Sequence, residues 1–223
     1  MTERVVQIFT PPFSNQVNFN AGLLREYMPR QRAELIVTGW HDVRPDLHGI
    51  RRNYSILARS ILEEGHPGLW TLPRAAVLFE DCRKVMEERR PDLVIADYRS
   101  PEAVLAAQAL HIPTWVSIPT VMGPNYNQEI IRKILEEETN VKALSALKDR
   151  HGIEIDTDGM ERIFGNLFQP GKVNLVHTYQ QVLPPDFLDN RQPADYLVVG
   201  NFLAEKYVRK EAVGQKPTIF ISF

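Results

Sequence analysis

Short apolar runs alternate with amphipathic helical stretches along most of this chain, and this alternation constrains the fold more than any other feature. The first run covers residues 4–9, a helical pattern follows with apolar side chains at Val17, Ala21 and Leu24, and a second run covers residues 33–39. Apolar residues three and four positions apart share one face of a helix, whereas the two short apolar runs have the length of buried strands. Strands that alternate with helices are typical of parallel βαβ units. We therefore predict an α/β fold with a parallel sheet and helices on both faces.

The middle of the chain carries the best-defined strand, turn and helix. Residues 93–96 are apolar, Asp97 closes the run, and Ser100, Pro101 and Glu102 have the residue types of an N-cap and a first helical turn. The same kinds of pattern predict helices at 73–89, 103–110 and 128–148, and strands at 114–118, 173–177 and 196–199. Two long excursions interrupt these elements, at residues 40–73 and 119–171.

The composition of the 223 residues excludes several classes of protein. Hydrophobic residues make up 43% and charged residues 24%, which is typical of a globular protein rather than a disordered or membrane protein. The formal net charge of −2 provides no basic surface for nucleic acid. No apolar run reaches the roughly 18 residues of a spanning helix, and the N-terminus lacks a signal-peptide pattern. We therefore expect a cytoplasmic protein with no membrane span.

Residues that could support redox, metal or phosphate chemistry are few. Cys82 is the single cysteine and lies in a helical pattern, so we expect a buried thiol rather than a disulfide. The six histidines show no paired spacing typical of a metal site, so none is predicted. Neither a G-x-G-x-x-G nor a G-K-[ST] loop is present, and this absence argues against a nucleotide-binding domain of the common types.

The C-terminal segment predicts a strand at which the chain ends. Residues 218–223 have high β propensity, and residues 204–217 are charged and weakly patterned, as in a linker. The strand could complete the sheet of the same domain, or it could be the first strand of a second domain that the chain does not contain. We favour the second interpretation, in which residues 1–203 form one domain.

Two polar loops are expected at the place where parallel sheets bind ligands. Ligands bind in the crevice beyond the carboxyl ends of the strands. The loops at residues 11–18 and 97–100 follow predicted strands and therefore lie there. Asp97 could be a helix-capping residue or a functional carboxylate, and both interpretations stay open at this stage.

Four short segments occur in the order and spacing of one protein family. They are Pro12 followed by QVN at 16–18, PDLVIAD at 91–97, VVG at 198–200 and PTIFISF at 217–223. Over its whole length the chain resembles the N-terminal domain of the nucleotide-sugar-dependent family 1 glycosyltransferases, which have the GT-B fold. The resemblance implies a Rossmann-like domain that is one half of a GT-B fold.

The resemblance also implies which substrate each half of a GT-B protein binds. The N-terminal half holds a small hydroxylated acceptor, and a C-terminal domain holds the donor, a UDP- or dTDP-sugar. The two excursions match the variable segments that shape the acceptor pocket, and their aromatic residues fit an apolar molecule. The acceptor-binding candidates are Phe13, Asn15, Trp40, Trp70, Tyr98 and Tyr126. Each aromatic side chain could instead serve only to pack the loops.

The sequence departs from the family at the catalytic base. An inverting enzyme of this family uses a His after the first strand to take the acceptor proton, and an Asp orients that His. Asp97 matches the Asp, whereas the His position falls on Gln16, whose amide cannot take a proton near neutral pH. Asp97 could itself be the base, the acceptor could be reactive enough to need little help, or the protein could be non-catalytic. His41 and His177 are expected to be structural rather than replacements for Gln16.

The leading hypothesis is the acceptor-binding half of an inverting glycosyltransferase, which transfers a sugar to a hydroxyl of a small, largely apolar molecule. Without the C-terminal domain this half is expected to be inactive. The alternative is a non-catalytic, glycosyltransferase-like protein that binds a small molecule or supports a partner enzyme. An unrelated Rossmann-like nucleotide binder is a weaker third possibility.

Overall fold

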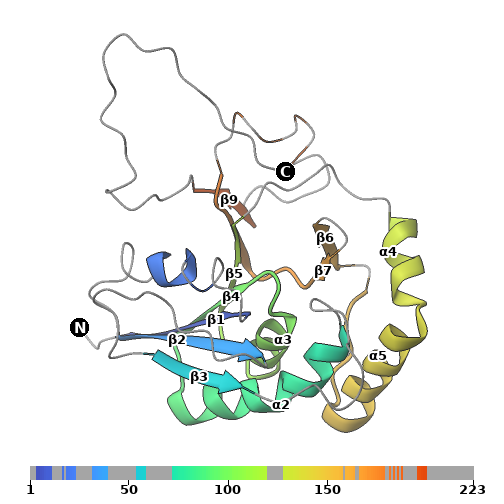
Figure 1. Ribbon diagram of the computed structural model, residues 1–223, viewed down its shortest axis with the longest axis horizontal. Helices are drawn as coiled ribbons and strands as arrows, with labels where there is room; N and C mark the ends of the chain where they lie inside the picture. Colours follow the sequence, from blue (N-terminus) through green and yellow to red (C-terminus); the bar gives the residue numbers. More distant parts are fainter. Residues whose placement is uncertain are drawn as a thin grey trace.

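The computed structural model describes most of the predicted elements. The described residues are 4–11, 17, 19–23, 32–39, 54–58, 72–119, 128–157, 159–163, 166–178, 181, 183, 185, 187 and 195–199. Within these ranges the chain forms one layered α/β arrangement, in which a twisted sheet lies between helices (Figure 1).

Seven parallel strands form the main sheet, in the order β3-β2-β1-β4-β5-β8-β9. This order and the parallel pairing are those of a Rossmann-like sheet, so the predicted fold class is confirmed. Pairing of β1 with both β2 and β4 puts the first strand in the interior of the sheet, which explains its apolar sequence. The strands are β1 Val5–Thr10, β2 Arg32–Gly39, β3 Tyr54–Ala58, β4 Leu93–Asp97, β5 Thr114–Ile118, β8 Val173–Val176 and β9 Tyr196–Val198.

Helices cover both faces of the sheet. The first helix, described at residues 17 and 19–23, lies on one face, and α2 and α3 lie on the other (Figure 1). The helix α5 runs beside α2, and a two-stranded hairpin of β6 and β7 lies between α4 and the sheet end. The bounds are α2 Leu72–Arg89, α3 Pro101–Ala109, α4 Gln128–Leu135, α5 Glu138–His151, β6 Glu161–Ile163 and β7 Asn166–Phe168.

The period-two alternation of the strands divides the core into two layers. Val94 and Ala96 of β4 face the larger layer with α2 and α3, whereas Ile95 faces the smaller layer with the first helix. Cys82 is fully buried in the larger layer, which confirms the expected buried thiol. The alternation decides which strand-end side chains share a face, and this determines the geometry of the site.

Some elements differ from the sequence prediction. The first excursion contains β3, the second contains the hairpin β6–β7, and the helix predicted at 128–148 is two helices. α4 ends where Asn140 of α5, buried at this junction, donates a hydrogen bond from its side chain to the Ile134 carbonyl oxygen at 2.8 Å. Ser100 occupies the N-cap position of α3, but its hydroxyl makes no capping bond.

Some predictions fall outside the described residues. The proposed linker at 204–217 and the strand at 218–223 belong to this part of the chain, so the domain boundaries stay predictions. Among the described helices, none combines the length and the apolar composition that crossing a bilayer requires.

Candidate active site at the sheet switch point

The chain reverses its direction of progress across the sheet between β1 and β4. From β1 it continues through β2 to β3, and it then returns to the other side of β1 to form β4. Such a switch point is where open α/β sheets bind ligands. Thr10 is the last residue of β1 and Asp97 the last of β4, and the preceding residues Phe9 and Ala96 are paired in register. Thr10 and Asp97 therefore flank the switch point.

Asn20 of the first helix joins these two strand ends. Its Nδ2 donates to Asp97 Oδ2 at 3.1 Å and to Thr10 Oγ1 at 3.0 Å. Asp97 Oδ1 accepts a second hydrogen bond from the backbone N–H of Arg99 at 3.0 Å. All three polar side chains are fully buried, so the carboxylate is held in one orientation by two donors.

Burial raises the pKa of Asp97 to about 6, because the charged carboxylate loses its water. The Arg99 N–H and the Asn20 amide oppose this shift, since both donate to the charged form. The carboxylate is therefore mostly ionised at neutral pH, yet it binds a proton more readily than an exposed aspartate. This combination suits a group that accepts a proton during a reaction.

A second polar pair lies beside Asp97 in the sheet. Ser117 of β5 is the register partner of Asp97, and its Oγ lies 3.3 Å from Nε2 of His177, the residue that follows β8. The backbone N–H of His177 donates to the Ile118 carbonyl at 3.0 Å, which continues the strand pairing. Burial lowers the pKa of His177 to about 4, so its imidazole is neutral at physiological pH.

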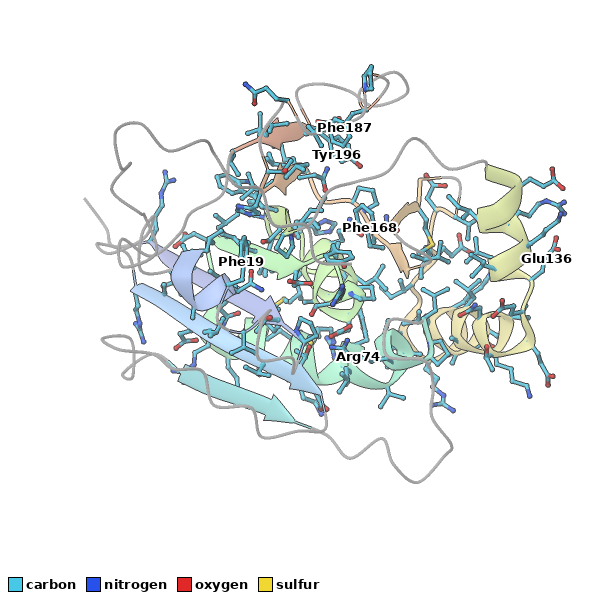
Figure 2. All side chains as sticks on the ribbon, turned by 45° about the horizontal axis from the view of Figure 1, so that its top comes forward. Phe19, Arg74, Glu136, Phe168, Phe187 and Tyr196 are labelled. Atoms are coloured by element: carbon cyan, nitrogen blue, oxygen red, sulfur yellow. The ribbon has the colours of Figure 1, made fainter. Side chains whose placement is uncertain are left out.

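The polar strand ends form one row. Thr10 and Asp97 are the last residues of β1 and β4, Ser117 is the penultimate residue of β5, and His177 follows β8. Strand alternation puts all four on the face covered by the first helix. Phe19 of that helix packs edge-on against the His177 ring, with the ring centroids 4.8 Å apart (Figure 2). The helix that supplies Asn20 to Asp97 thus also covers the histidine.

The structure describes two of the predicted site residues. Asp97 lies at the switch point, as a functional carboxylate would. Tyr98 points to the opposite face, where its ring is 1% exposed in the larger core layer and packs edge-on against Phe168. Because the pleat alternates side chains, the residue after Asp97 points into the core, and in this structure Tyr98 supports the turn rather than lining the crevice. The other candidates lie outside the described residues: Phe13, Asn15, Gln16, Trp40, Trp70 and Tyr126.

The sequence analysis did not identify Thr10, Asn20 or Ser117 as site residues. A signal was available for the strand residues, because Thr10 is polar directly after an apolar run and Ser117 is polar near the end of another. Asn20 gave no comparable signal, since its contact with Asp97 joins positions 77 residues apart. Among the described residues, no group of three or more His, Cys, Asp or Glu side chains is arranged to hold a metal ion.

At the level of sequence, no family model and no curated protein matches the chain. The fold, however, is similar to that of GT-B glycosyltransferases. A glycosyltransferase of kitacinnamycin aligns with a TM-score of 0.65 and 16% identity, over 98% of this chain and 56% of that protein. The calicheamicin glycosyltransferase CalG4 aligns with a TM-score of 0.65 and 14% identity, over 91% and 53%.

The same fold also occurs in a different class of enzyme. A UDP-N-acetylglucosamine 2-epimerase aligns with a TM-score of 0.50 and 15% identity, over 90% of this chain and 49% of that one. At such identities the likeness shows the fold alone, which is that of one Rossmann-like half of a GT-B protein. The chain spans about half the length of these proteins.

Proposed function

We propose that this chain is the acceptor-binding half of an inverting glycosyltransferase. The enzyme would transfer a sugar from a UDP- or dTDP-sugar to a hydroxyl of a small, largely apolar molecule. The fold supports this proposal through its likeness to two glycosyltransferases over more than nine-tenths of the chain. The sequence supports it through the resemblance at 91–97, which ends at Asp97.

The observation that carries the proposal is the buried Asp97 carboxylate at the switch point, held by Asn20 and by the Arg99 N–H. In the proposed reaction the acceptor oxygen forms a bond to the anomeric carbon, and its proton passes to Asp97. The bond from that carbon to the nucleotide diphosphate breaks on the opposite side, which inverts the configuration. Of the three explanations for Gln16, we favour Asp97 as the base, because its pKa of about 6 keeps it ionised near neutral pH.

A donor domain would complete the enzyme. The chain spans about half the length of its structural neighbours, and no glycine-rich phosphate loop follows β1. We therefore expect the isolated chain to bind acceptors without transferring sugar to them. Catalysis would require the donor sugar to be held opposite Asp97 by the second domain.

Binding to the isolated chain tests the assignment of the acceptor half. The ¹⁵N-labelled chain would be titrated with a hydroxylated aromatic probe, 4-methylumbelliferone, and separately with UDP-glucose. We expect the phenol to shift the side-chain amide of Asn20 and the backbone amides of Asp97 and Arg99, because these groups surround the switch point. UDP-glucose should leave them unchanged. A shift by UDP-glucose without any shift by hydroxylated probes would contradict the proposal and indicate a nucleotide-binding half.

A non-catalytic binding protein is the second candidate. The observation that favours it is chemical: Gln16 stands at the expected base position, and the side chain that contacts Asp97 is the amide of Asn20. Neither amide takes up a proton near neutral pH. This candidate predicts the same acceptor binding as the first. The two differ in whether a two-domain form transfers sugar in a reaction that needs Asp97.

A further inference from the structure

An ion pair is buried beneath the site, on the sheet face opposite the first helix. Arg74 comes from the first turn of α2 and Glu102 from the first turn of α3, and their N–O distance is 2.6 Å. Their side chains are 1% and 0% exposed, and Arg74 lies in the body of the molecule (Figure 2). Taking two charges out of water costs free energy that their attraction repays only with good additional hydrogen bonds.

The hydrogen bonds of this pair reach the end of β2 and the turn after β4. Arg74 donates from Nη2 to the Thr38 carbonyl at 3.1 Å and to Thr38 Oγ1 at 2.7 Å, at the end of β2. The Thr38 hydroxyl in turn donates to Glu102 Oε1 at 2.7 Å. Arg74 also donates from Nη1 to the carbonyl oxygen of Arg99 at 2.9 Å. The pair therefore connects α2, α3, β2 and the turn after β4.

The contact with Arg99 leads directly to the catalytic carboxylate. The carbonyl of Arg99 accepts from Arg74, and the N–H of the same residue donates to Asp97 Oδ1. Fixing the carbonyl of one residue restricts the direction of its N–H, because only two backbone dihedral angles separate them. The turn is closed further by the Ser100 N–H, which donates to the Asp97 carbonyl at 2.7 Å.

The pair is not arranged for maximum stability. Glu102 Oε2 is buried and has no hydrogen-bond partner among the described residues. A buried pair with an unsatisfied oxygen is weak evidence for a stabilising role, and apolar replacement of such a pair is often neutral or favourable. What the pair does provide is a fixed guanidinium group with one donor, Nη1, on the turn that carries Asp97.

We propose that Arg74 is a positioning residue for Asp97, with Glu102 as its counter-ion. Arg74 holds the turn of residues 97–100 so that the Arg99 N–H remains on Asp97 and the carboxylate stays oriented at the switch point. The catalytic meaning of this arrangement rests on the proposed function. Its effect on Asp97, however, is a property of the isolated chain and can be measured without sugar transfer.

The test compares Asp97 in the wild-type chain, in Arg74→Met/Glu102→Leu and in the control Arg83→Met. Arg83 lies on the same helix, but it is partly exposed and pairs with Glu80 and Glu87 at the surface. The proton affinity of Asp97 would be followed by ¹³C-carboxyl NMR titration, and the exchange rate of the Arg99 amide by hydrogen exchange.

The double variant should remain folded, because both charges are removed together. We expect the proton affinity of Asp97 to rise roughly threefold or more, since the Arg99 N–H and the positive charge of Arg74 both favour the charged form in the wild type. The Arg99 amide should exchange roughly tenfold faster, as expected for a loosened turn. The Arg83→Met control should change neither quantity. A folded double variant with unchanged Asp97 titration and unchanged Arg99 exchange would overturn the proposal.

A conservative variant keeps the test decisive if the double variant does not fold. Arg74→Lys retains the charge, but a single ammonium group cannot replace the two guanidinium nitrogens that reach Arg99 and Thr38. We expect the same changes at Asp97 and Arg99 as in the double variant, though smaller. Wild-type titration and exchange in folded Arg74→Lys would overturn the proposal. If the wild-type chain failed to bind the hydroxylated probe while the variants altered the titration of Asp97, the proposed function would be refuted. The positioning role of Arg74 would still stand.

Discussion

Burial moves the pKa of Asp97 and the pKa of His177 in opposite directions. The carboxyl is raised to about 6 and the imidazole lowered to about 4, because burial penalises the charged form of each. The two groups are close in the row of strand ends, and the register partner of Asp97, Ser117, contacts His177. Their shifts make separate and opposite contributions to the pH dependence of stability.

We predict that Asp97→Asn removes a loss of stability that the wild-type chain shows as the pH rises through 6. The folded pKa of Asp97 lies above the ordinary value of 3.8, so its contribution to stability is full below pH 4 and is lost as the pH rises through 6. At pH 7.5 the ionised carboxylate should cost about 3 kcal/mol relative to pH 3. In urea unfolding, the stability of the variant relative to the wild type should be about 1–3 kcal/mol greater at pH 7.5 than at pH 4.

A surface carboxylate provides the matched control. Asp149→Asn on the exposed side of α5 removes the same charge without removing a buried one. Asp149→Asn should change the free energy of unfolding by no more than about 0.5 kcal/mol at either pH. Asparagine offers one oxygen where Asp97 accepts from both Asn20 and Arg99, but this loss is the same at both pH values. If the difference in free energy of unfolding between the variant and the wild type were equal at pH 4 and pH 7.5, the raised pKa of Asp97 would be contradicted.

We predict the opposite pH dependence for the His177 site. The folded pKa lies below the ordinary value of 6.5, so the unfolded state takes up a proton first, and stability is lost as the pH falls from 6.5 to 4. The full loss should be about 3 kcal/mol. His177→Gln removes the titrating group, so unfolding free energies measured from pH 7 to pH 4 should fall less steeply than those of the wild type.

The exposed His111 is a suitable comparison for this experiment. Its φ is 56°, a left-handed conformation that asparagine tolerates, so His111→Asn should fold as the wild type does. Equal slopes for His177→Gln and the wild type would show that His177 is not buried as a neutral imidazole. The contributions of Asp97 and His177 to the free energy of unfolding change in opposite directions over nearly the same pH range. The single variants separate these contributions, whereas the wild-type curve shows only their sum.

At the scale of elements, local signals predicted those segments whose sequence alone favours one structure. β4 and α3 were predicted because a short apolar run, a polar turn and a first-turn proline and acid lie within a few residues of one another. β3 was not predicted because its strand character depends on pairing with β2, its neighbour in the sheet. The break between α4 and α5 depends on the Asn140 side chain, which reaches back to a carbonyl six residues earlier.

A close approach of two backbones before β8 gives an element-scale prediction. A Cβ at Gly171 would lie 2.7 Å from the Thr114 carbonyl oxygen of β5, a distance that requires the backbone to move. Gly171→Ala should therefore destabilise the chain by about 1–3 kcal/mol, as overpacking does. At Gly159 the nearest atom is the end of the flexible Asp156 side chain, at 3.1 Å.

Urea unfolding of both variants checks this prediction. Gly159→Ala should change the unfolding free energy by about 0.5 kcal/mol or less, because a side chain can move aside. If Gly171→Ala changed the unfolding free energy as little as Gly159→Ala, the backbone of Gly171 would lie farther from the Thr114 carbonyl oxygen than the structure shows.

At the scale of the whole molecule, the sequence predicted the fold class and the position of Asp97 at the end of a strand. The order of strands in the sheet agrees with the predicted alternation, and Asp97 lies at the switch point. The partners of Asp97 could not be predicted in the same way. Asn20 lies 77 positions from Asp97 and Arg74 lies 25 from Arg99, so these contacts exist only once the sheet and helices have assembled.

The architecture also explains why one carboxylate can be held so firmly. The first helix contacts Asp97 from one face of the sheet through Asn20, and Arg74 holds the following turn from the other face through Arg99. A group held from both sides is preorganised, and preorganised groups require little rearrangement during a reaction. We regard this as the feature of the molecule that best agrees with a catalytic role.

The most direct test of the account is sugar transfer by this chain joined to a GT-B donor domain. The assay would use 2-phenylethanol, an alcohol that stays protonated at neutral pH, with UDP-α-glucose or dTDP-α-glucose, and the configuration of the product would be read by NMR. We predict a β-glucoside, and a rate that falls about 10²–10⁴-fold in Asp97→Ala, as expected for loss of a general base. An α-glucoside, or an Asp97→Ala rate within twofold of the wild type, would contradict the account.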